Sequence, residues 1–348
     1  MITARCISAK SEKLERLNQL LSITWARNGF YRRKWTQAGI HCHRLEALSD
    51  LERFPITARA ELVHDQSIHP PFGTNLSAPL EHYHFIFRSS GTTLSPLVWA
   101  DTAETWHWIT HGSEELYKTA RVQWGERILF LIPFAASPGP WIMHRGATQL
   151  GCTCLVAGRD DAREQWRWLQ QFEPTVLVGT PEQIIRLGCS PARPHSDPCL
   201  SPIQKIISAG RPGGSVSSLR VQMQNLFGAE VFDRYGMTEA GSVAAECPAH
   251  AGMHVLEDEF IAECLKPDED KPVEEGETGE IVLTNLGRTA RPIIRYRTGD
   301  FAQLSRDYKC SCGRRGSVIV GGITRNLSRE KFCAAEYNSS GNGSRRVN

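Results

Sequence analysis

The chain has 348 residues, of which 41% are hydrophobic and 22% charged, and its formal net charge is +2 at pH 7. This length allows one large domain or two smaller ones, and the small net charge gives no reason to expect a nucleic-acid or membrane partner. The longest apolar run, residues 128–136, is interrupted by Pro133 and is too short to span a bilayer. Residues 1–6 lack the apolar core of a signal peptide, so we expect a cytoplasmic location.

Helical and strand patterns alternate along the chain up to residue 227. Helices are predicted at residues 12–26, 102–119, 161–171, 181–187 and 215–227. Short β-branched or apolar strands are predicted at residues 84–87, 127–132, 154–156, 175–178 and 205–208. This alternation favours an α/β fold of mostly parallel sheets flanked by helices. After residue 240 the pattern changes to short strands and turns, as at 280–285 and 301–304, which predicts a small β-rich subdomain.

A turn rich in hydroxyls and glycine follows the first predicted strand. Its residues are Ser89, Ser90, Gly91, Thr92 and Thr93, followed by Leu94-Ser95-Pro96. Such a turn can wrap a polyphosphate with backbone N–H groups and hydroxyls, because glycine lets the backbone approach the oxygens closely. Clusters of this kind are also often ordinary turns, and no Gly-Lys-Ser/Thr ends this one as in a Walker A loop. The turn therefore indicates phosphate binding only together with other motifs.

Three further motifs follow in order. They are Asp233-Arg234-Tyr235-Gly236-Met237-Thr238-Glu239, Gly276-Glu277-Thr278-Gly279-Glu280, and Ile294-Arg295-Tyr296-Arg297-Thr298-Gly299-Asp300. With the hydroxyl-rich turn, they resemble in order and spacing the core motifs of the adenylate-forming superfamily of acyl-CoA ligases and adenylation domains. Asn28-Gly29-Phe30-Tyr31 and Phe54-Pro55-Ile56-Thr57 resemble the phenylacetate–CoA ligase branch in particular. The resemblance covers roughly residues 12 to 325.

The resemblance implies a reaction that joins a carboxylate to the α-phosphate of ATP and then passes the acyl group to a thiol. Glu239 is the candidate contact for Mg²⁺, because hard cations prefer carboxylate oxygen, and Thr238 can bond an α-phosphate oxygen. Tyr235 offers a flat face for adenine, and Asp300 matches the family residue that accepts bonds from the ribose hydroxyls. The alternatives are a core aromatic for Tyr235 and a turn residue for Asp300. The expected nucleotide site is completed by Gly236, Arg297 and the turn at residues 89–93.

His144 is a candidate for orienting the substrate carboxylate, since the branch has a histidine near its acyl pocket, but a structural role in an apolar stretch fits equally well. A Ser-His-Asp hydrolase is disfavoured, because no Gly-x-Ser-x-Gly motif occurs. Two positions depart from the family pattern. Leu94-Ser95 stands where relatives have Gly-Lys, and Arg211 stands where a glutamate is usual.

Eleven cysteines without a signal peptide argue against a disulfide framework. Cys247, His254, Cys310 and Cys312 could supply three thiolates and an imidazole to a closed tetrahedral zinc site. The spacing alone fits free thiols as well, and His250 competes with His254 as the imidazole. Some members of the branch carry a structural zinc at such a site, so the resemblance favours zinc.

The domain organisation expected from the resemblance has two parts and a tail. Residues 1–240 form the α/β core, residues 241–325 the β-rich subdomain, and the polar, Gly/Ser-rich residues 326–348 a disordered tail. Relatives continue into a mobile lid domain that carries a catalytic lysine, and we expect this lid to be absent.

The expected function is ATP-dependent activation of an aryl or arylacetic acid, then thioester formation with CoA or a carrier-protein thiol, impaired in the lid-less chain. The alternative is an inactive truncated remnant or a nucleotide- or acyl-binding partner protein. The expected cofactors are ATP or AMP, Mg²⁺, CoA and structural Zn²⁺. A separate lid polypeptide and a homodimer are left open as partners.

Overall fold

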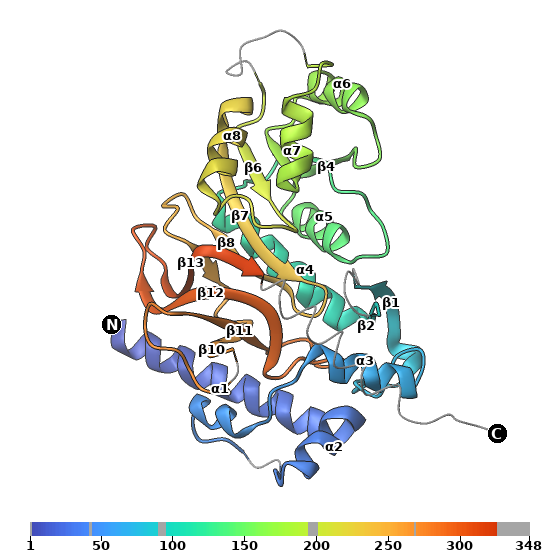
Figure 1. Cartoon of the computed structure of the whole chain (residues 1–348), viewed down its shortest axis with the longest axis vertical. Helices are drawn as coiled ribbons and strands as arrows, with labels where there is room; N and C mark the ends of the chain where they lie inside the picture. Colours follow the sequence, from blue (N-terminus) through green and yellow to red (C-terminus); the bar gives the residue numbers. More distant parts are fainter. Residues whose placement is uncertain (1, 42–43, 90–94, 194–200, 268, 326–348) are drawn as a thin grey trace, which may run out of the picture.

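One large mixed sheet runs through the molecule (Figure 1). The computed structural model describes residues 2–41, 44–89, 95–193, 201–267 and 269–325. Among these residues, eleven strands follow the order β10-β11-β12-β13-β9-β8-β7-β6-β5-β3-β4, and β1 (Tyr83–Arg88) pairs with β2 (Val98–Thr102) in a separate hairpin. The predicted α/β class is confirmed.

The parallel half of the sheet consists of apolar strands joined by helices. The strands are β3 (Arg127–Phe130), β4 (Thr153–Val156), β5 (Val176–Gly179), β6 (Lys205–Ser208) and the first half of β7 (Glu230–Met237). The connecting helices are α5 (Gly139–Gln149), α6 (Ala162–Phe172), α7 (Pro181–Gly188) and α8 (Ser217–Phe227). All four residues of β5 are buried, as expected for a parallel strand covered on both faces.

The antiparallel half starts from the same strand, β7. Its first residues pair with β6, whereas Arg234–Met237 pair with β8. The strands of this half are β8 (Gly241–Glu246), β9 (Met253–Val255), β10 (Phe260–Leu265), β11 (Thr278–Asn285), β12 (Tyr296–Lys309) and β13 (Arg315–Arg325). Because β7 belongs to both halves, residues at its end lie where the two halves meet.

The N-terminal helices pack on the antiparallel half. They are α1 (Ile2–Arg27), α2 (Gly29–Gln37) and α3 (Arg59–Ile68), with short 3₁₀ turns at Leu48–Arg53 and Leu80–His82. One apolar core contains Tyr31 and Trp35 of α2 together with Leu283 of β11 and Ile293. Helix α4 (Ala103–Thr119) packs against α5 and β8. The predicted boundary at residue 240 stays a prediction.

Every predicted helix and strand overlaps an observed one. Thr102, Asp161 and Thr180 cap the helices that follow them, as their side chains accept bonds from backbone N–H groups. Helices α2, α3 and α5, strand β2 and most strands from residue 230 onward were not predicted from the sequence. No helix of the described residues is long and apolar enough to cross a membrane.

Three buried arginines stand in the segment between β11 and β12. Arg295 pairs with Glu263 and donates to the carbonyls of Glu52 and Phe54, which ties the N-terminal segment to the sheet. Arg288 and Arg291 lie over the ring of Trp99, with 4.9 Å and 4.6 Å to its centroid. Arg288 also donates to both carboxylate oxygens of Asp101. Neither side chain of the Arg288–Asp101 pair is exposed.

We expect Asp101→Asn to lower the free energy of unfolding by about 3–5 kcal/mol, because it leaves the Arg288 cation buried without its counter-charge. Urea unfolding measures this loss. Glu164→Gln is the matched control. Its partner is Arg167, both side chains are largely exposed, and the change should stay within about 1 kcal/mol. Equal effects of the two substitutions would contradict the importance of the buried pair.

Candidate functional site

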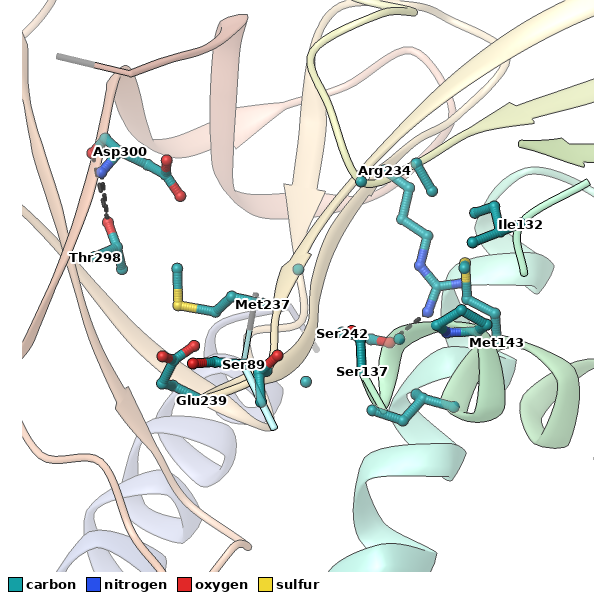
Figure 2. Close-up of a pocket in the computed structure, with 18 of the residues that line it drawn as sticks. Ser89, Ile132, Ser137, Met143, Arg234, Met237, Glu239, Ser242, Thr298 and Asp300 are labelled. Carbon is teal, nitrogen blue, oxygen red and sulfur yellow. Dashed lines mark hydrogen bonds between the residues drawn. The ribbon is translucent and has the colours of Figure 1, made fainter. Parts of the chain in front are cut away.

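A cavity of about 340 Å³ lies at the carboxyl ends of the parallel strands (Figure 2). Ile132 and Pro133 follow β3, Thr180 follows β5, Ala209 and Gly210 follow β6, and Gly236–Thr238 end β7 or follow it. The antiparallel half contributes Thr298–Asp300 of β12 to the opposite wall. Ligands of open α/β sheets bind at this edge, so the position agrees with a binding site.

Asp300 and Thr298 form one end of the cavity (Figure 2). Asp300 is buried, and its Oδ2 accepts a hydrogen bond of 2.9 Å from the hydroxyl of Tyr235. The backbone N–H of Asp300 donates to the hydroxyl of Thr298 at 3.1 Å. Tyr235 is itself buried and is not among the described lining residues, whereas its neighbour Gly236 is. Tyr235 therefore orients Asp300, and its stacking on adenine stays a prediction.

Gly236 allows strands β7 and β8 to approach closely beside the cavity. A Cβ atom added at this position would lie 2.5 Å from the carbonyl oxygen of Gly241 on β8. Such a contact is impossible without moving the backbone, so any larger residue here would displace the end of β7. Steric crowding therefore explains why position 236, which was predicted to belong to the site, is a glycine.

Glu239 lies at the middle of the cavity and is paired with a cation. Arg59, the first residue of α3, donates from Nη1 to Glu239 Oε1 at 2.6 Å. Its Nη2 donates to the hydroxyl of Ser89 at 3.0 Å and to the carbonyl of Ser95 at 3.4 Å. Arg59 therefore connects the predicted metal-binding carboxylate to both ends of the hydroxyl-rich turn.

Arg288 fixes the backbone of this part of the site. Its Nη1 donates to the carbonyl of Thr238 at 2.8 Å and to that of Glu239 at 2.7 Å. Its Nε and Nη2 donate to the carboxylate of Asp101, and its face lies on Trp99. Because both carbonyls are bonded by a buried cation, the turn after β7 has little freedom to rotate.

The end of the cavity away from Asp300 is apolar except for a few groups (Figure 2). Ile132, Ile142 and Met143 supply apolar wall, and Ser137, Ser242 and Arg234 supply polar atoms. Arg234 Nη2 donates to the hydroxyls of Ser113, at 2.7 Å, and Ser242. This end can hold a small organic group with limited polarity.

Two predicted site residues lie away from the cavity. Arg297 pairs with Glu280 and with Asp270 (2.9 Å), so it faces the acidic loop before β11. His144 on α5 packs against the rings of Phe130 and Phe134, with centroids 5.9 Å and 5.5 Å away. Burial, and then the charge of Arg145, lower the pKa of His144, so its imidazole is neutral near pH 7. Neither residue is among those described as lining the cavity, and their functional roles stay predictions.

Four members of the predicted phosphate loop, Ser90, Gly91, Thr92 and Thr93, lie outside the described residues, as does the tail at residues 326–348. Ser89, at the start of the loop, does line the cavity. Arg211 is exposed and lies 3.8 Å from Glu182.

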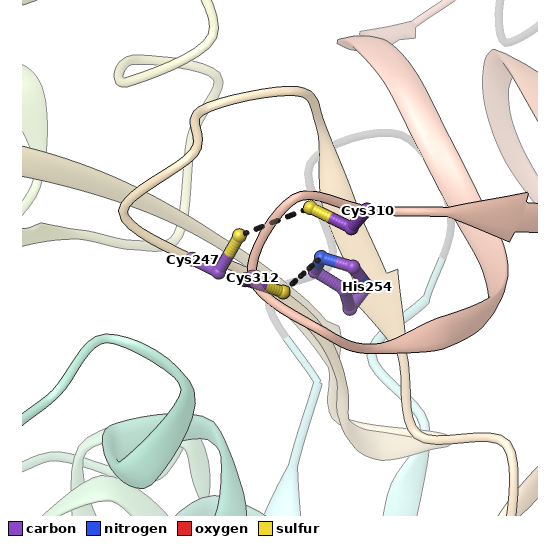
Figure 3. Close-up of side chains that lie close together, drawn as sticks. All are labelled: Cys247, His254, Cys310 and Cys312. Atoms are coloured by element: carbon purple, nitrogen blue, oxygen red, sulfur yellow. Dashed lines mark hydrogen bonds between the residues drawn. The ribbon is translucent and has the colours of Figure 1, made fainter.

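The predicted cysteine and histidine residues form a compact cluster elsewhere (Figure 3). The ligand atoms of Cys247, His254, Cys310 and Cys312 all lie within 4.8 Å of one another. The two closest pairs, Cys247 Sγ with Cys310 Sγ and Cys312 Sγ with His254 Nε2, are each 3.7 Å apart. Ligands about 2.3 Å from a tetrahedral zinc lie roughly 3.8 Å from one another, so this donor set fits a zinc ion. His250 instead contacts Arg220 and Glu230.

The structure adds three arginines that the sequence analysis did not identify as site residues, namely Arg59, Arg234 and Arg288. Arg234 stands within the quoted Asp233–Glu239 motif, so its place near the site could have been suspected from the sequence. Arg59 and Arg288 are more remote, and their contacts to Glu239 join residues 180 and 49 positions apart. No local pattern reveals such contacts.

Comparisons with known proteins agree with this geometry. The model of the family described as AMP-binding enzyme matches residues 38–288. The phenylacetate–coenzyme A ligase of Aromatoleum evansii is 29% identical over 84% of this chain and 66% of its own length. That of Escherichia coli K12 is 27% identical over 87% of this chain and 68% of its own length. The chain thus spans about two thirds of the length of these relatives.

Solved structures extend the similarity. A 2-hydroxyisobutyryl-CoA ligase, in complex with 2-HIB-AMP and CoA in its thioesterification state, superposes with a TM-score of 0.87. It is 26% identical in sequence, and the match covers 92% of this chain and 69% of the ligase. The family match, the relatives and this fold together show that the chain belongs to the AMP-binding enzymes, in the phenylacetate–CoA ligase-like branch of the adenylate-forming superfamily.

Proposed function

We propose that the chain activates a carboxylic acid with ATP to an acyl-adenylate, which then forms a thioester with CoA or a carrier-protein thiol. One observation carries this proposal. Ser89, Thr238, Glu239 and Asp300, which come from three distant parts of the chain, line one cavity. A carboxylate for ribose, hydroxyls for phosphate and a carboxylate for a cation are the groups that adenylation requires.

The positions of these groups along the cavity determine at which end each of the two substrates would bind. Asp300 accepts hydrogen bonds from the ribose hydroxyls, and the hydroxyl of Thr238 donates to the α-phosphate. Figure 2 shows Met237 and Glu239, the chain neighbours of Thr238, between Asp300 and the Met143 end, so the acid reaches the α-phosphate from that far end. Its carboxylate oxygen attacks phosphorus, and the bond to pyrophosphate breaks.

The substrate carboxylate and the phosphates of ATP are both anions, and residues in the middle of the cavity would compensate their charge. Glu239, with the hydroxyls of Ser89 and Thr238 lining the same cavity, offers the hard oxygen donors that Mg²⁺ prefers. The ion, when bound, neutralises phosphate charge. Arg59 holds the Glu239 carboxylate in the cavity and lies beside the hydroxyl-rich turn, where it can compensate for the absent loop lysine.

The substrate we propose is an aryl or arylacetic acid. The relatives named above are phenylacetate–coenzyme A ligases, and Ile132, Ile142 and Met143 provide apolar surface where the acyl group would lie. Apolar walls with a few polar groups are typical of sites for small organic ligands.

ATP–pyrophosphate exchange tests the reaction. With purified protein, Mg²⁺ and a panel of phenylacetate, benzoate, hydroxybenzoates and short fatty acids, we expect exchange with an aryl acid. Glu239→Gln should reduce the exchange rate by about 10²-fold or more, because it weakens the site for the Mg²⁺ ion that would compensate phosphate charge in the transition state. Glu164→Gln, an exposed carboxylate on α6 that pairs with Arg167, is the control and should retain the rate. ATP binding without exchange for any acid would instead support a nucleotide-binding protein without turnover.

A second prediction concerns Arg59. Arg59→Met should lower the exchange rate by about 10²-fold, since it removes a positioned cation beside the phosphates, and Arg59→Lys should retain part of it. Arg53→Met is the matched control, because Arg53 is exposed in the preceding turn and pairs only with Asp50 among the described residues. Steady-state exchange at varied ATP concentrations separates weaker binding from slower chemistry. An unchanged rate in Arg59→Met would assign the residue a structural role only.

We also propose that Cys247, His254, Cys310 and Cys312 bind a structural zinc ion that ties the segments before β9 and β13 together. The ion would have no catalytic role, because protein ligands fill all four coordination positions and leave none for water or substrate.

Metal analysis of protein purified without chelator should give about one equivalent of zinc. Cys310→Ser should lose most of the metal and lower the midpoint of thermal unfolding, since metal binding is coupled to folding. Cys189→Ser changes an exposed free cysteine and should keep both values. Less than about a tenth of an equivalent in the unmodified chain would count against the site.

A further inference from the structure

Arg234 is a buried cation without a carboxylate partner among the described residues. It projects from β7 into the wall of the cavity, and only 8% of its surface is exposed. Its hydrogen-bond partners are the neutral hydroxyls of Ser113 and Ser242, and its guanidinium lies 5.5 Å from the ring centroid of Tyr117. Nη1 has no hydrogen-bond partner in the described part of the chain.

This arrangement differs from that of Arg288 and Arg295. Arg288 has Asp101 as its counter-ion and Arg295 has Glu263. Arg291 also has no ion pair among the described residues, but unlike Arg234 it does not line the cavity. A buried guanidinium without a counter-charge costs several kcal/mol of desolvation free energy, by order of magnitude. Burial accordingly lowers the pKa of Arg234. A charge kept in such a position needs a compensating partner or a functional reason.

A water molecule does not remove this need. A small space of about 10 Å³ lies between Tyr117, Arg234 and Phe232, at the lower limit for holding one water. A water there would satisfy Nη1 and the Tyr117 hydroxyl, which also has no hydrogen-bond partner within the described residues. It would leave the positive charge uncompensated.

Ser242 connects this charge to the cavity. Its Oγ accepts a bond from Arg234, so its own proton is available to an acceptor, and Ser242 lines the cavity. A hydroxyl polarised by a cation is a stronger donor than a serine alone. Figure 2 shows Arg234 and Ser242 at the end opposite Asp300 and Thr298, where the acyl group of the substrate would lie.

We infer that Arg234 and Ser242 select an acid that carries a second oxygen acceptor, best an anionic one such as a ring carboxylate, away from the carboxyl group that is activated. The inference rests on the proposed function, because that function places the acyl group at this end. The apolar walls contact the ring, Ser242 donates to the second oxygen, and the Arg234 charge is compensated once the substrate is bound. An acid without that oxygen leaves the charge uncompensated.

Binding of non-reactive adenylate analogues tests this without turnover. The probes are acyl-sulfamoyl adenosines with phenylacetyl, hydroxyphenylacetyl and carboxyphenylacetyl groups, the last two as meta and para isomers, and AMP serves as the reference ligand. Calorimetry should show that at least one carboxy isomer binds about tenfold or more tighter than the phenylacetyl analogue. Arg234→Met should abolish or reverse this preference and leave AMP affinity unchanged, whereas Arg234→Lys should keep part of the preference.

Controls separate the inference from folding and from the proposed function. Arg53→Met removes an exposed cation that does not line the cavity, and should keep the preference. Thermal unfolding checks that Arg234→Met is folded. The inference would be wrong if the phenylacetyl analogue bound most tightly and its affinity were unchanged in Arg234→Met. AMP binding in the same experiment would still support the nucleotide site. Failure of AMP and all analogues to bind would overturn the proposed function and the inference with it.

Discussion

The buried guanidinium of Arg288 is the interaction on which the site depends. It bonds the Asp101 carboxylate on one side and the carbonyls of Thr238 and Glu239 on the other, and its face lies on Trp99. These groups come from β2, from the turn after β7 and from the segment between β11 and β12. Separating a buried cation from its partners costs several kcal/mol, by order of magnitude, so the interaction holds these segments in one arrangement.

The sheet topology explains why the cavity has two chemically different walls. The parallel half brings the ends of β3, β5, β6 and β7 to one edge, and the antiparallel half brings Asp300 of β12 to face them. Strand β7 belongs to both halves, and Gly236 lets β8 pass within contact of it. Charge is then distributed unevenly along the cavity. Glu239 is matched by Arg59 and lies beside the carbonyls held by Arg288, whereas Arg234 has only hydroxyl partners among the described residues.

Local patterns in the sequence predicted much of this arrangement. Thr238, Glu239 and Asp300 stand in short motifs, and the helices after Thr102, Asp161 and Thr180 carry capping side chains that any reading of the sequence can find. The cluster of Cys247, His254, Cys310 and Cys312 was predicted from ligand types and from the family resemblance, and the structure brings all four together.

What the sequence did not reveal depends on contacts between distant residues. The pairing of Arg59 with Glu239 joins positions 180 apart, and that of Arg288 with Asp101 joins positions 187 apart. The helix α5 was missed because Pro138 and Pro140 at its start resemble a loop, although proline is well tolerated in a first helical turn. Arg234 could be seen in its motif, but its burial without a counter-ion is a property of the folded protein alone.

A crystal structure of the chain with Mg²⁺ and ATP would show whether this cavity binds the nucleotide. We expect the ribose hydroxyls at Asp300, the α-phosphate at Thr238, the metal ion at Glu239 and the Arg234 end left open for the acid. Nucleotide bound elsewhere, or bound with its ribose away from Asp300, would contradict this expectation.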